Sequence, residues 1–375
     1  MAAIFTPGLK VAADTMVVKD RRLPIEGEVL VKKGQVVEAD TIVARTELPG
    51  KIFPVNIANQ LGVSPGRLKD YLHKTAGDTV TEGEVIARTN GIMGLFQTEA
   101  TALISGTLES VSSVTGEAIF QAHPVPVEID AYINGVVVDV HDGEGCVIQN
   151  QGTMVQGIFG LGGEVKGTIR MAVEEATDPL SEDRITPDMA NQIIVGGAYL
   201  PRQTVQKAID VGVAGIVTGG FDYDDIKDLL GYEVGVAITG GEDLGLTIIV
   251  TEGFGHIQMA PGTFKLLKSN VGRRASINGA TQIRAGVIRP EVVVTVRDTD
   301  VGAEPWEPPE PKGIQLGDTV RAIRAPHFGK IGRVKSLPVD LVTMESETRV
   351  RIMEVEFDDG TVAGLPRANV ESIDR

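Results

Sequence analysis

The chain has 375 residues, with 51 Asp and Glu against 35 Lys and Arg and a formal net charge of -16. This acidic balance argues against a general nucleic-acid binder, because backbone binding depends on Lys and Arg displacing counterions from phosphates. The length allows about two to four domains, and 45 Gly with only 4% aromatic residues indicate turn-rich folded domains with aliphatic cores.

The overall composition predicts a cytoplasmic protein with no membrane association. No apolar run approaches the ~18 to 20 residues that a membrane span needs, and the first residues lack the layout of a secretory signal. Because Cys146 is the only cysteine in the sequence, an intrachain disulfide is excluded, and its side chain is expected in a core. The five histidines are scattered without ligand spacing, so no metal site is predicted.

An internal repeat organises the first part of the chain. Residues 34–46 (GQVVEADTIVART) and 77–89 (GDTVTEGEVIART) align without gaps. Each copy predicts a Gly turn, a short strand and a second, half-buried strand. Residues 104–120 have the same alternation of Gly turns and strands. We therefore expect an all-β unit over residues 1–165.

The second copy resembles the biotinyl/lipoyl domains and the related barrel-sandwich hybrids, because residues 77–87 follow the pattern G-D-x-V-x-x-G-x-x-[IL]-A. The resemblance implies a barrel-sandwich hybrid over residues 1–165. In that family a hairpin lysine carries biotin or lipoate. Here no lysine lies between Lys74 and Lys166, and ungapped counting places Leu95 at that position. The resemblance therefore implies a non-carrier docking module, with no cofactor.

Three segments interrupt the repeat pattern. Residues 63–74 predict an inserted helix with Ser64 as N-cap and Pro65 at the first helical position. Gly-rich stretches lie at 141–146 and 156–164, and the second is interpreted as a β-hairpin or a domain hinge. A strand pattern follows the second of them, where a phosphate-binding loop would open a helix.

Strand and helix patterns alternate in residues 166–297 and predict a central, open, mostly parallel α/β sheet. Helices are expected at 201–212, 222–231 and 263–272, between apolar runs that end in Gly or Thr/Gly turns. In such sheets ligands bind beyond the carboxyl ends of the strands. We therefore expect a ligand-binding domain here.

The turns after these strands predict a site for a phosphate or a carboxylate. Glycine lets backbone N–H groups approach a ligand, and threonine adds a hydroxyl donor. The 38 positions between Glu252 and Glu291 contain six Lys and Arg and no acidic residue, so they offer positive charge for an anion. The predicted ligand-binding residues are Gly196, Gly197, Thr218, Gly219, Gly220, Thr239, Gly240, Thr251, Gly253, Gln282 and Arg284.

Catalysis at this site would depend on Glu252 as the first candidate for a general acid or base, and on His256 as the second. Both residues also suit structural roles, Glu252 as the ion-pair partner of an arginine and His256 as a packed or exposed side chain. The sequence offers no nucleophile with a recognisable partner. Whether the protein is an enzyme therefore stays open.

The C-terminal part begins with an acidic, Pro-rich linker over residues 298–312, which contains Trp306. Residues 313–375 predict short alternating strands of a small β-barrel and resemble the KOW module, with Gly317-Asp318 and 328–332 (FGKIG) in the expected order. KOW proteins often contact RNA, the ribosome or RNA polymerase. Nine Lys and Arg against ten Asp and Glu favour protein docking over RNA binding.

The sequence as a whole predicts a multi-domain adaptor or regulatory binding protein with an anion or small-molecule site in its central domain. Its expected partner is another protein or a second copy of the chain. Two alternatives remain. One is an enzyme acting on a phosphorylated or carboxylated metabolite at the Thr/Gly turns, and the other is a translation or transcription accessory factor working through the KOW-like domain. The ligand and the oligomeric state are not determined by the sequence.

Overall fold

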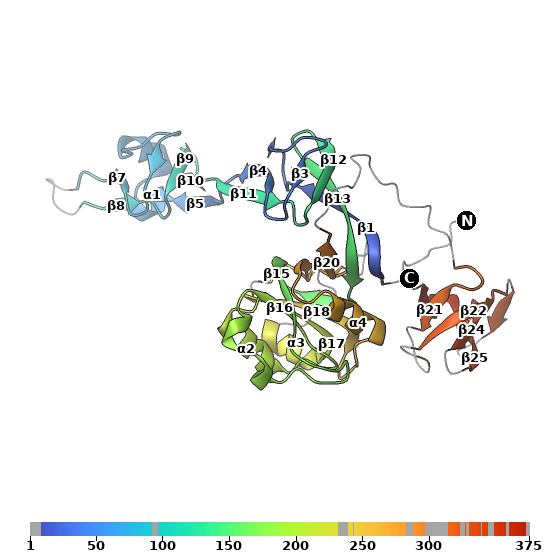
Figure 1. Ribbon diagram of the computed structural model, residues 1–375. Helices are drawn as coiled ribbons and strands as arrows, with labels where there is room; N and C mark the ends of the chain where they lie inside the picture. The colour runs from blue at the N-terminus through green and yellow to red at the C-terminus, as the bar shows by residue number, and fades with distance from the viewer. Residues whose placement is uncertain are drawn as a thin grey trace.

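The computed structural model is mostly β, with 48% strand and 15% helix, arranged in one large mixed sheet and several small sheets. We divide it into a proximal lobe (9–48 and 125–156), a distal lobe (51–122), a central body (157–296) and a C-terminal domain (314–372). Figure 1 shows that the distal lobe projects from one side of the molecule. The described residues are 9–91, 97–231, 239–242, 244–282, 288–296, 314–322, 327, 330–338, 340–343, 349–357 and 360–372.

The proximal lobe has the long strand β13 at its centre, which pairs antiparallel with both β1 and β12. Cys146 is buried in the core of this lobe, as expected, and burial raises the pKa of its thiol to about 11. The strands of the lobe are β1 (Val11–Arg22), β2 (Glu28–Val29), β3 (Val36–Val37), β4 (Ile42–Leu48), β11 (Val125–Asp130), β12 (Gly135–His141) and β13 (Gly145–Gln156).

The distal lobe has a separate hydrophobic core, which includes Leu68, Leu108 and Phe120. Its strands connect to those of the proximal lobe through residues 49–51 and 123–124. The elements of the lobe are β5 (Ile52–Asn56), α1 (Ile57–Leu61), a 3-10 helix (Pro65–Asp70), β6 (Thr79–Val80), β7 (Val85–Arg88), β8 (Glu99–Thr101), β9 (Gly106–Val111) and β10 (Glu117–Ala122).

The helix expected at 63–74 starts where the sequence predicts, with Ser64 as N-cap, but it is a short 3-10 helix. It ends early because the next residues pair with β7. The N–H of Arg88 donates to the Tyr71 carbonyl, and the N–H of His73 donates to the Ile86 carbonyl. Pairing with a strand therefore ends the helical hydrogen bonding.

The two copies of the sequence repeat lie in different lobes. The first copy forms β3 and β4, and the second forms β6 and β7. The leading glycines both have positive φ, 84° at Gly34 and 94° at Gly77. The N–H of Gly34 donates to Val137, and that of Gly77 donates to Leu108 in the matching position of the other lobe. The predicted repeat is therefore confirmed as a pair of equivalent turns and strands.

The equivalence extends to the strands that complete each lobe. Arg88 of β7 lies opposite Glu99 of β8, and Arg45 of β4 lies opposite Glu128 of β11 in the same way. The β7–β8 connection of the distal lobe therefore corresponds to the β4–β11 connection of the proximal lobe. The whole distal lobe lies within that β4–β11 connection. Leu95, the position of the carrier lysine in the resembled family, falls between β7 and β8 and outside the described residues.

The central body contains the parallel part of the large sheet. Neighbouring strands β15 to β18 are parallel, whereas β14, β19 and β20 pair antiparallel, so the sheet as a whole is mixed. The three predicted helices are observed as α2, α3 and α4. The elements are β14 (Phe159–Leu161), β15 (Glu164–Met171), β16 (Gln192–Val195), α2 (Arg202–Val211), β17 (Gly215–Phe221), α3 (Tyr223–Leu230), β18 (Thr247–Phe254), α4 (Pro261–Ser269), β19 (Arg274–Asn278) and β20 (Glu291–Thr295), with 3-10 helices at Glu182–Arg184 and Pro187–Met189.

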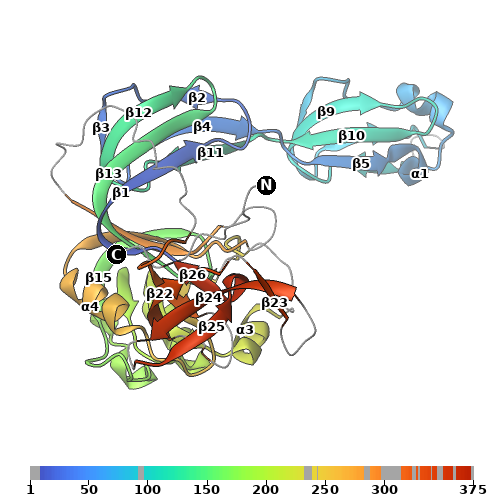
Figure 2. The ribbon, with the colours of Figure 1, turned by 90° about the vertical axis from the view of Figure 1, so that its right-hand side faces the viewer.

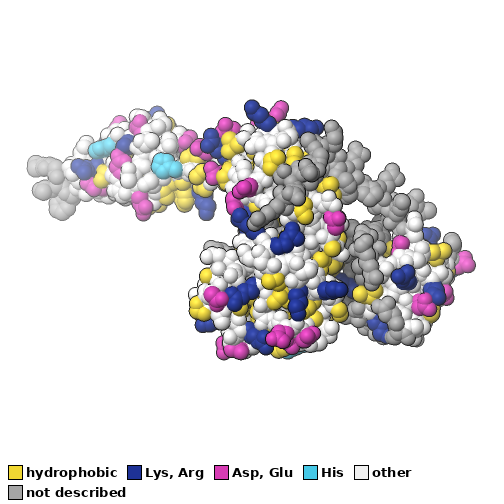
Figure 3. All heavy atoms as spheres, in the orientation of Figure 1, with side chains coloured by type: hydrophobic (Ala, Val, Ile, Leu, Met, Phe, Trp, Pro, Cys, Tyr) yellow, Lys and Arg dark blue, Asp and Glu magenta, His cyan; other side chains and the backbone are white. Residues whose placement is uncertain are grey.

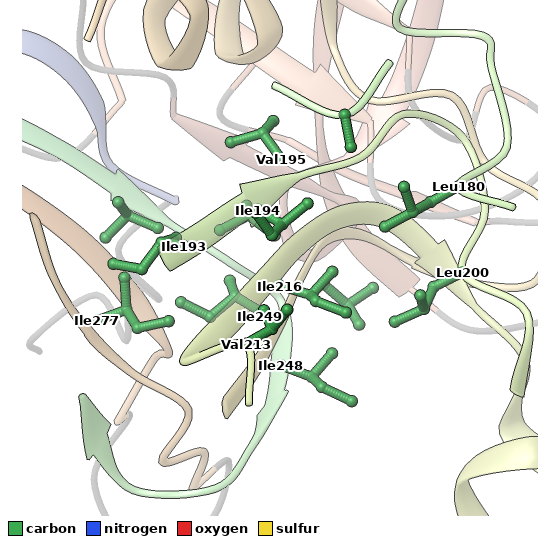
Figure 4. Close-up of a cluster of buried hydrophobic side chains, with 14 of the residues drawn as sticks. Leu180, Ile193, Ile194, Val195, Leu200, Val213, Ile216, Ile248, Ile249 and Ile277 are labelled. Carbon is green, nitrogen blue, oxygen red and sulfur yellow. The ribbon is translucent and has the colours of Figure 1, made fainter. Parts of the chain in front are cut away.

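The parallel strands form the core of the body, as Figure 4 shows for Ile194, Ile216 and Ile249. All three side chains are fully buried. Strands covered on both faces carry continuous apolar runs, which is why the sequence pattern of these segments predicted the strands.

The body and the proximal lobe share one sheet, because β20 pairs with β13. The predicted domain boundary at residue 165 falls inside β15. Ion pairs also join the two parts. Arg21 makes two hydrogen bonds of 2.7 Å to Glu164, and Lys166 contacts both Asp130 and Asp40.

The C-terminal domain has its own small core around Val320, Met353 and Val355. It lies against the central body on the side of α4 (Figure 1 and Figure 2). The linker at 298–312, with Trp306, lies outside the described residues. The strands of the domain are β21 (Thr319–Ala322), β22 (Ile331–Ser336), β23 (Leu341–Thr343), β24 (Arg349–Phe357), β25 (Val362–Pro366) and β26 (Val370–Ser372), with a 3-10 helix at Arg367–Asn369.

Gly106 offers a test of the close strand packing in the distal lobe. A Cβ at this position would lie 2.0 Å from the Gln121 carbonyl oxygen, so Gly106→Ala requires the β9 and β10 backbones to separate. We expect a loss of about 1–3 kcal/mol in the free energy of unfolding of this lobe, measured by urea titration with hydrogen exchange. Gly66→Ala is the control, because a Cβ at Gly66 meets no atom within 4 Å. Equal effects of the two variants would contradict this packing.

Asp40 gives the junction of lobe and body a predicted pH dependence. A hydrogen bond from Arg274, supported by Lys166, holds the pKa of the Asp40 carboxyl below its usual range. A lowered folded-state pKa stabilises the protein above the unfolded value of about 3.9, and this stabilisation is lost as the pH falls through the folded value. We expect thermal melts of Asp40→Asn to lose part of the acid sensitivity below about pH 4. Asp70→Asn in the distal lobe is the control, and an identical acid response of wild type and Asp40→Asn would refute the prediction.

Candidate functional site

The predicted ligand-binding residues are divided between two places in the central body. Those at or beside the carboxyl ends of β16, β17 and β18 are Gly196, Gly197, Thr218, Gly219, Gly220, Thr251 and Gly253. Thr239, Gly240 and Gln282 instead belong to loops beside β14, where Thr239 bridges to Thr281. Arg284 lies outside the described residues. The structure therefore brings only the first group together.

The threonine hydroxyls of both groups bond to the protein backbone. Thr251 donates to the Thr218 carbonyl at 3.2 Å, and Thr218 donates to the Gly220 carbonyl at 3.3 Å. Thr239 donates to the Gly160 carbonyl at 2.8 Å. All three threonines are buried. The hydroxyls of Thr239 and Thr251 therefore connect neighbouring segments, whereas that of Thr218 bonds within β17.

The glycines at the end of β17 allow the loop after β18 to pack directly on the strand. A Cβ on Gly219 would lie 2.3 Å from the Ile257 carbonyl oxygen, and a Cβ on Gly220 would lie 2.0 Å from that of Gly255. Any side chain at either position would collide with backbone. The loop at 255–259 therefore covers this strand end, and the open space at the carboxyl edge lies farther along, next to β18.

Glu252, the first candidate for an acid or base, joins the central body to the C-terminal domain. One carboxylate oxygen accepts a hydrogen bond of 2.8 Å from Arg321 of β21, and the other accepts one of 3.0 Å from the Ala260 N–H at the start of α4. The two charged side chains are only 10% and 13% exposed. Both oxygens of Glu252 therefore already have partners.

Two cavities lie beside this ion pair, and Ala260, Pro261, Arg321 and Ile331 line both of them. The larger, which we name the α4 cavity, has a volume of about 480 Å³ and lies between the start of β1, α4 and the C-terminal domain. The smaller, the Glu252 cavity, has a volume of about 220 Å³. Its other lining residues are Ile158, Glu252, Ile257, Gln258, Met259 and Ala322.

His256, the second catalytic candidate, lies in a different cluster at the carboxyl edge. Its ring stacks on that of Tyr199 with 3.5 Å between centroids and 16° between planes. The Tyr199 hydroxyl donates to the Asp225 carboxylate at 3.2 Å, and burial together with Asp225 raises the pKa of Tyr199. Within the described part of the chain no hydrogen bond or ion pair joins His256 to Glu252. The two candidates therefore do not form one catalytic unit.

The basic stretch extends away from the strand ends instead of encircling them. Lys265 and Lys268 are exposed on α4. Arg273 donates to the Asn270 side chain and to a backbone carbonyl of β20, whereas Arg274 pairs with Asp40 of the proximal lobe. Of these side chains, Lys265 alone lines the α4 cavity. Among the described residues of the stretch, Lys265 therefore supplies positive charge directly to the α4 cavity.

Sequence reasoning did not single out Tyr199, Asp225, Arg321 or Ile331 as site residues. Tyr199 and Asp225 follow the ends of β16 and β17, so their positions after strand ends were a usable signal. Arg321 and Ile331 lie directly opposite each other in the C-terminal domain. Their contact with the central body has no local sequence signature.

The described residues include no group of three or more His, Cys, Asp or Glu side chains placed to hold a metal ion. They also include no helix with the length and apolar character needed to cross a membrane. Comparison with known proteins adds no further assignment, since no family model matches the chain and a search of curated proteins gives no match. Roles for these residues therefore come from their geometry.

The Glu252–Arg321 pair leads to a prediction about the attachment of the C-terminal domain. Glu252→Ala removes the carboxylate that pairs with the largely buried guanidinium of Arg321. We expect a loss of about 3 kcal/mol in the free energy of unfolding. The double variant Glu252→Gln with Arg321→Met removes both charges and is expected to recover most of this loss. Both changes in stability are measured by unfolding the full chain in urea and following protease cleavage of its C-terminal domain.

The control for this cycle is Lys335→Ala, which removes an exposed ion pair with Glu356. It is expected to cost less than about 1 kcal/mol. Strictly additive effects of Glu252→Gln and Arg321→Met, each measured alone and together, would show that the two side chains are not coupled.

Proposed function

We propose that the protein is a multi-domain adaptor or regulatory binding protein that holds a small molecule between its central body and its C-terminal domain. The carrying observation is the Glu252–Arg321 pair beside the two cavities. The best-placed carboxylate has both oxygens occupied, while space of ligand size lies next to it. This arrangement supports binding more than catalysis.

The two lobes support the adaptor part of the proposal. We infer that they are non-carrier barrel-sandwich hybrids, since each has the Gly-turn repeat and its own core. The distal lobe projects from the body, and Ile52 of this lobe and Val125 of the proximal lobe are exposed near the connection between the lobes. Apolar groups on a projecting surface suit a protein partner. Basic and acidic side chains are interspersed on the face in Figure 3, a pattern that also favours a protein over a nucleic acid.

An enzyme acting on a phosphorylated or carboxylated metabolite is the second candidate. The observation that favours it is the Asp225–Tyr199–His256 cluster at the carboxyl edge, where a hydroxyl with a raised pKa lies beside an exposed imidazole.

We infer further that the central body is an α/β ligand-binding domain and that the C-terminal domain is a KOW-like small barrel. An accessory role in translation or transcription would require salt-sensitive RNA association that is lost on deletion of residues 313–375.

Native mass spectrometry of the full chain, gently purified from its own host, tests the proposed function. We expect a discrete added mass from a small molecule, a protein partner, or both. The bound small molecule is expected to remain chemically unchanged on incubation with the protein. Conversion of that molecule would support the enzyme, and copurifying RNA would support the accessory factor. A bare monomer without ligand or partner would contradict a binding function.

A further inference from the structure

We propose that the α4 cavity binds a small amphipathic carboxylate, with its apolar chain inside the cavity and its carboxylate at the start of α4. This inference rests on the proposed binding function and specifies the class of ligand. The α4 cavity has a volume of about 480 Å³, which is typical of small-molecule sites, since these range over about 300–1,000 Å³.

The walls of the cavity suit an apolar chain. Aliphatic side chains line it from three separate segments: Leu9 and Val11 at the start of β1, Leu266 on α4, and Ile331 on β22. Its described lining residues include no acidic side chain, although the chain as a whole carries a net charge of -16. An anion in this cavity would therefore meet no carboxylate from the part of the lining that the structure describes.

The start of α4 supplies a polar end to the cavity. The first N–H groups of a helix have no partners within the helix and favour negative charge. Here the N-cap residue, Ala260, makes no side-chain cap, and its own N–H donates to Glu252. The next residues, Pro261, Gly262 and Thr263, line the cavity, so the N–H groups of the last two are placed near a ligand.

Thr263 is an independent sign of a polar ligand. The residue is only 5% exposed, yet it lines the cavity. Within the described residues its hydroxyl makes no hydrogen bond. A carboxylate oxygen at this end of the cavity would accept a hydrogen bond from this hydroxyl.

Lys265 contributes positive charge at the same end of α4. It is exposed and lines the cavity, so its ammonium group can approach a bound carboxylate from the solvent side. Arg321 also lines the cavity but is paired with Glu252. The proposed carboxylate therefore needs no change in that ion pair.

The test is isothermal titration of the full chain with decanoate, using decanol as the uncharged probe of the same chain length. We expect saturable binding of decanoate, and binding of decanol weaker by about tenfold or more, since hydrogen bonds from donors to a carboxylate are charge-assisted. Thr263→Val keeps the shape of the side chain and removes the hydroxyl. It is expected to weaken decanoate about tenfold with little change for decanol.

Gly262 provides a pair of matched variants for the location of the site. A Cβ at Gly262 meets no atom within 4 Å, so the first carbon of a new side chain there has open space. Gly262→Phe is expected to block decanoate by filling space in the cavity, whereas Gly262→Ala, which adds one methyl group, retains binding. A thermal melt of each variant checks that the fold is intact.

Equal binding of decanoate and decanol would overturn the assignment to a carboxylate. Decanoate binding that survives in a folded Gly262→Phe variant would place the ligand elsewhere and overturn the site. Failure of decanoate to bind would overturn the ligand class but leave the proposed function standing if native mass spectrometry still shows another small molecule. Absence of any bound small molecule or partner would count against both.

Discussion

The pairing of β13 with strands from both sides is the constraint on which the architecture depends. This 12-residue strand pairs with β1 and β12 in the proximal lobe and with β20 in the central body. Asn150, fully buried within it, donates hydrogen bonds to the carbonyls of Asn134 and Val296. A buried amide fixes register, because a shift would leave its donors without acceptors. The lobe and the body are therefore parts of one sheet, with ion pairs added at their junction.

The C-terminal domain is attached by a different kind of contact. The described residues of its strands pair with one another and have no backbone pairing with the large sheet. Its described ion pair with the central body is the one between Arg321 and Glu252. A contact between side chains beside two cavities is easier to adjust than a shared sheet, since no strand pairing of the large sheet has to be broken among the described residues. The structure thus combines a continuous sheet through lobe and body with one adjustable interface, where the proposed ligand lies.

Local patterns explain what the sequence could predict. Gly34 and Gly77 mark turns that need positive φ, and the alternation after them sets which side chains enter each core, so the repeat was recognisable. The nesting of one lobe inside the other was not recognisable from the sequence. Equivalent residues lie 43 positions apart in the first strands of the two lobes, but the equivalent glycines Gly106 and Gly135 lie only 29 positions apart. An ungapped alignment cannot follow this change of offset. The hydroxyl of Thr218 illustrates a second limit. Its residue type suits a ligand, but a backbone carbonyl in its own turn takes its hydrogen bond.

The position of the α4 cavity links ligand binding to the arrangement of the domains. Its walls come from the start of β1, from α4 and from the C-terminal domain, so a ligand that contacts all three is bound only while they are assembled. A ligand that binds the assembled state stabilises that state by mass action, by about 2.7 kcal/mol at a hundred times its Kd. This is comparable to the loss of about 3 kcal/mol expected when Glu252 alone is removed from its pair with Arg321. Occupancy of the cavity would therefore shift how firmly the C-terminal domain is held against the body, and an adaptor built this way can report a small molecule through the position of a whole domain.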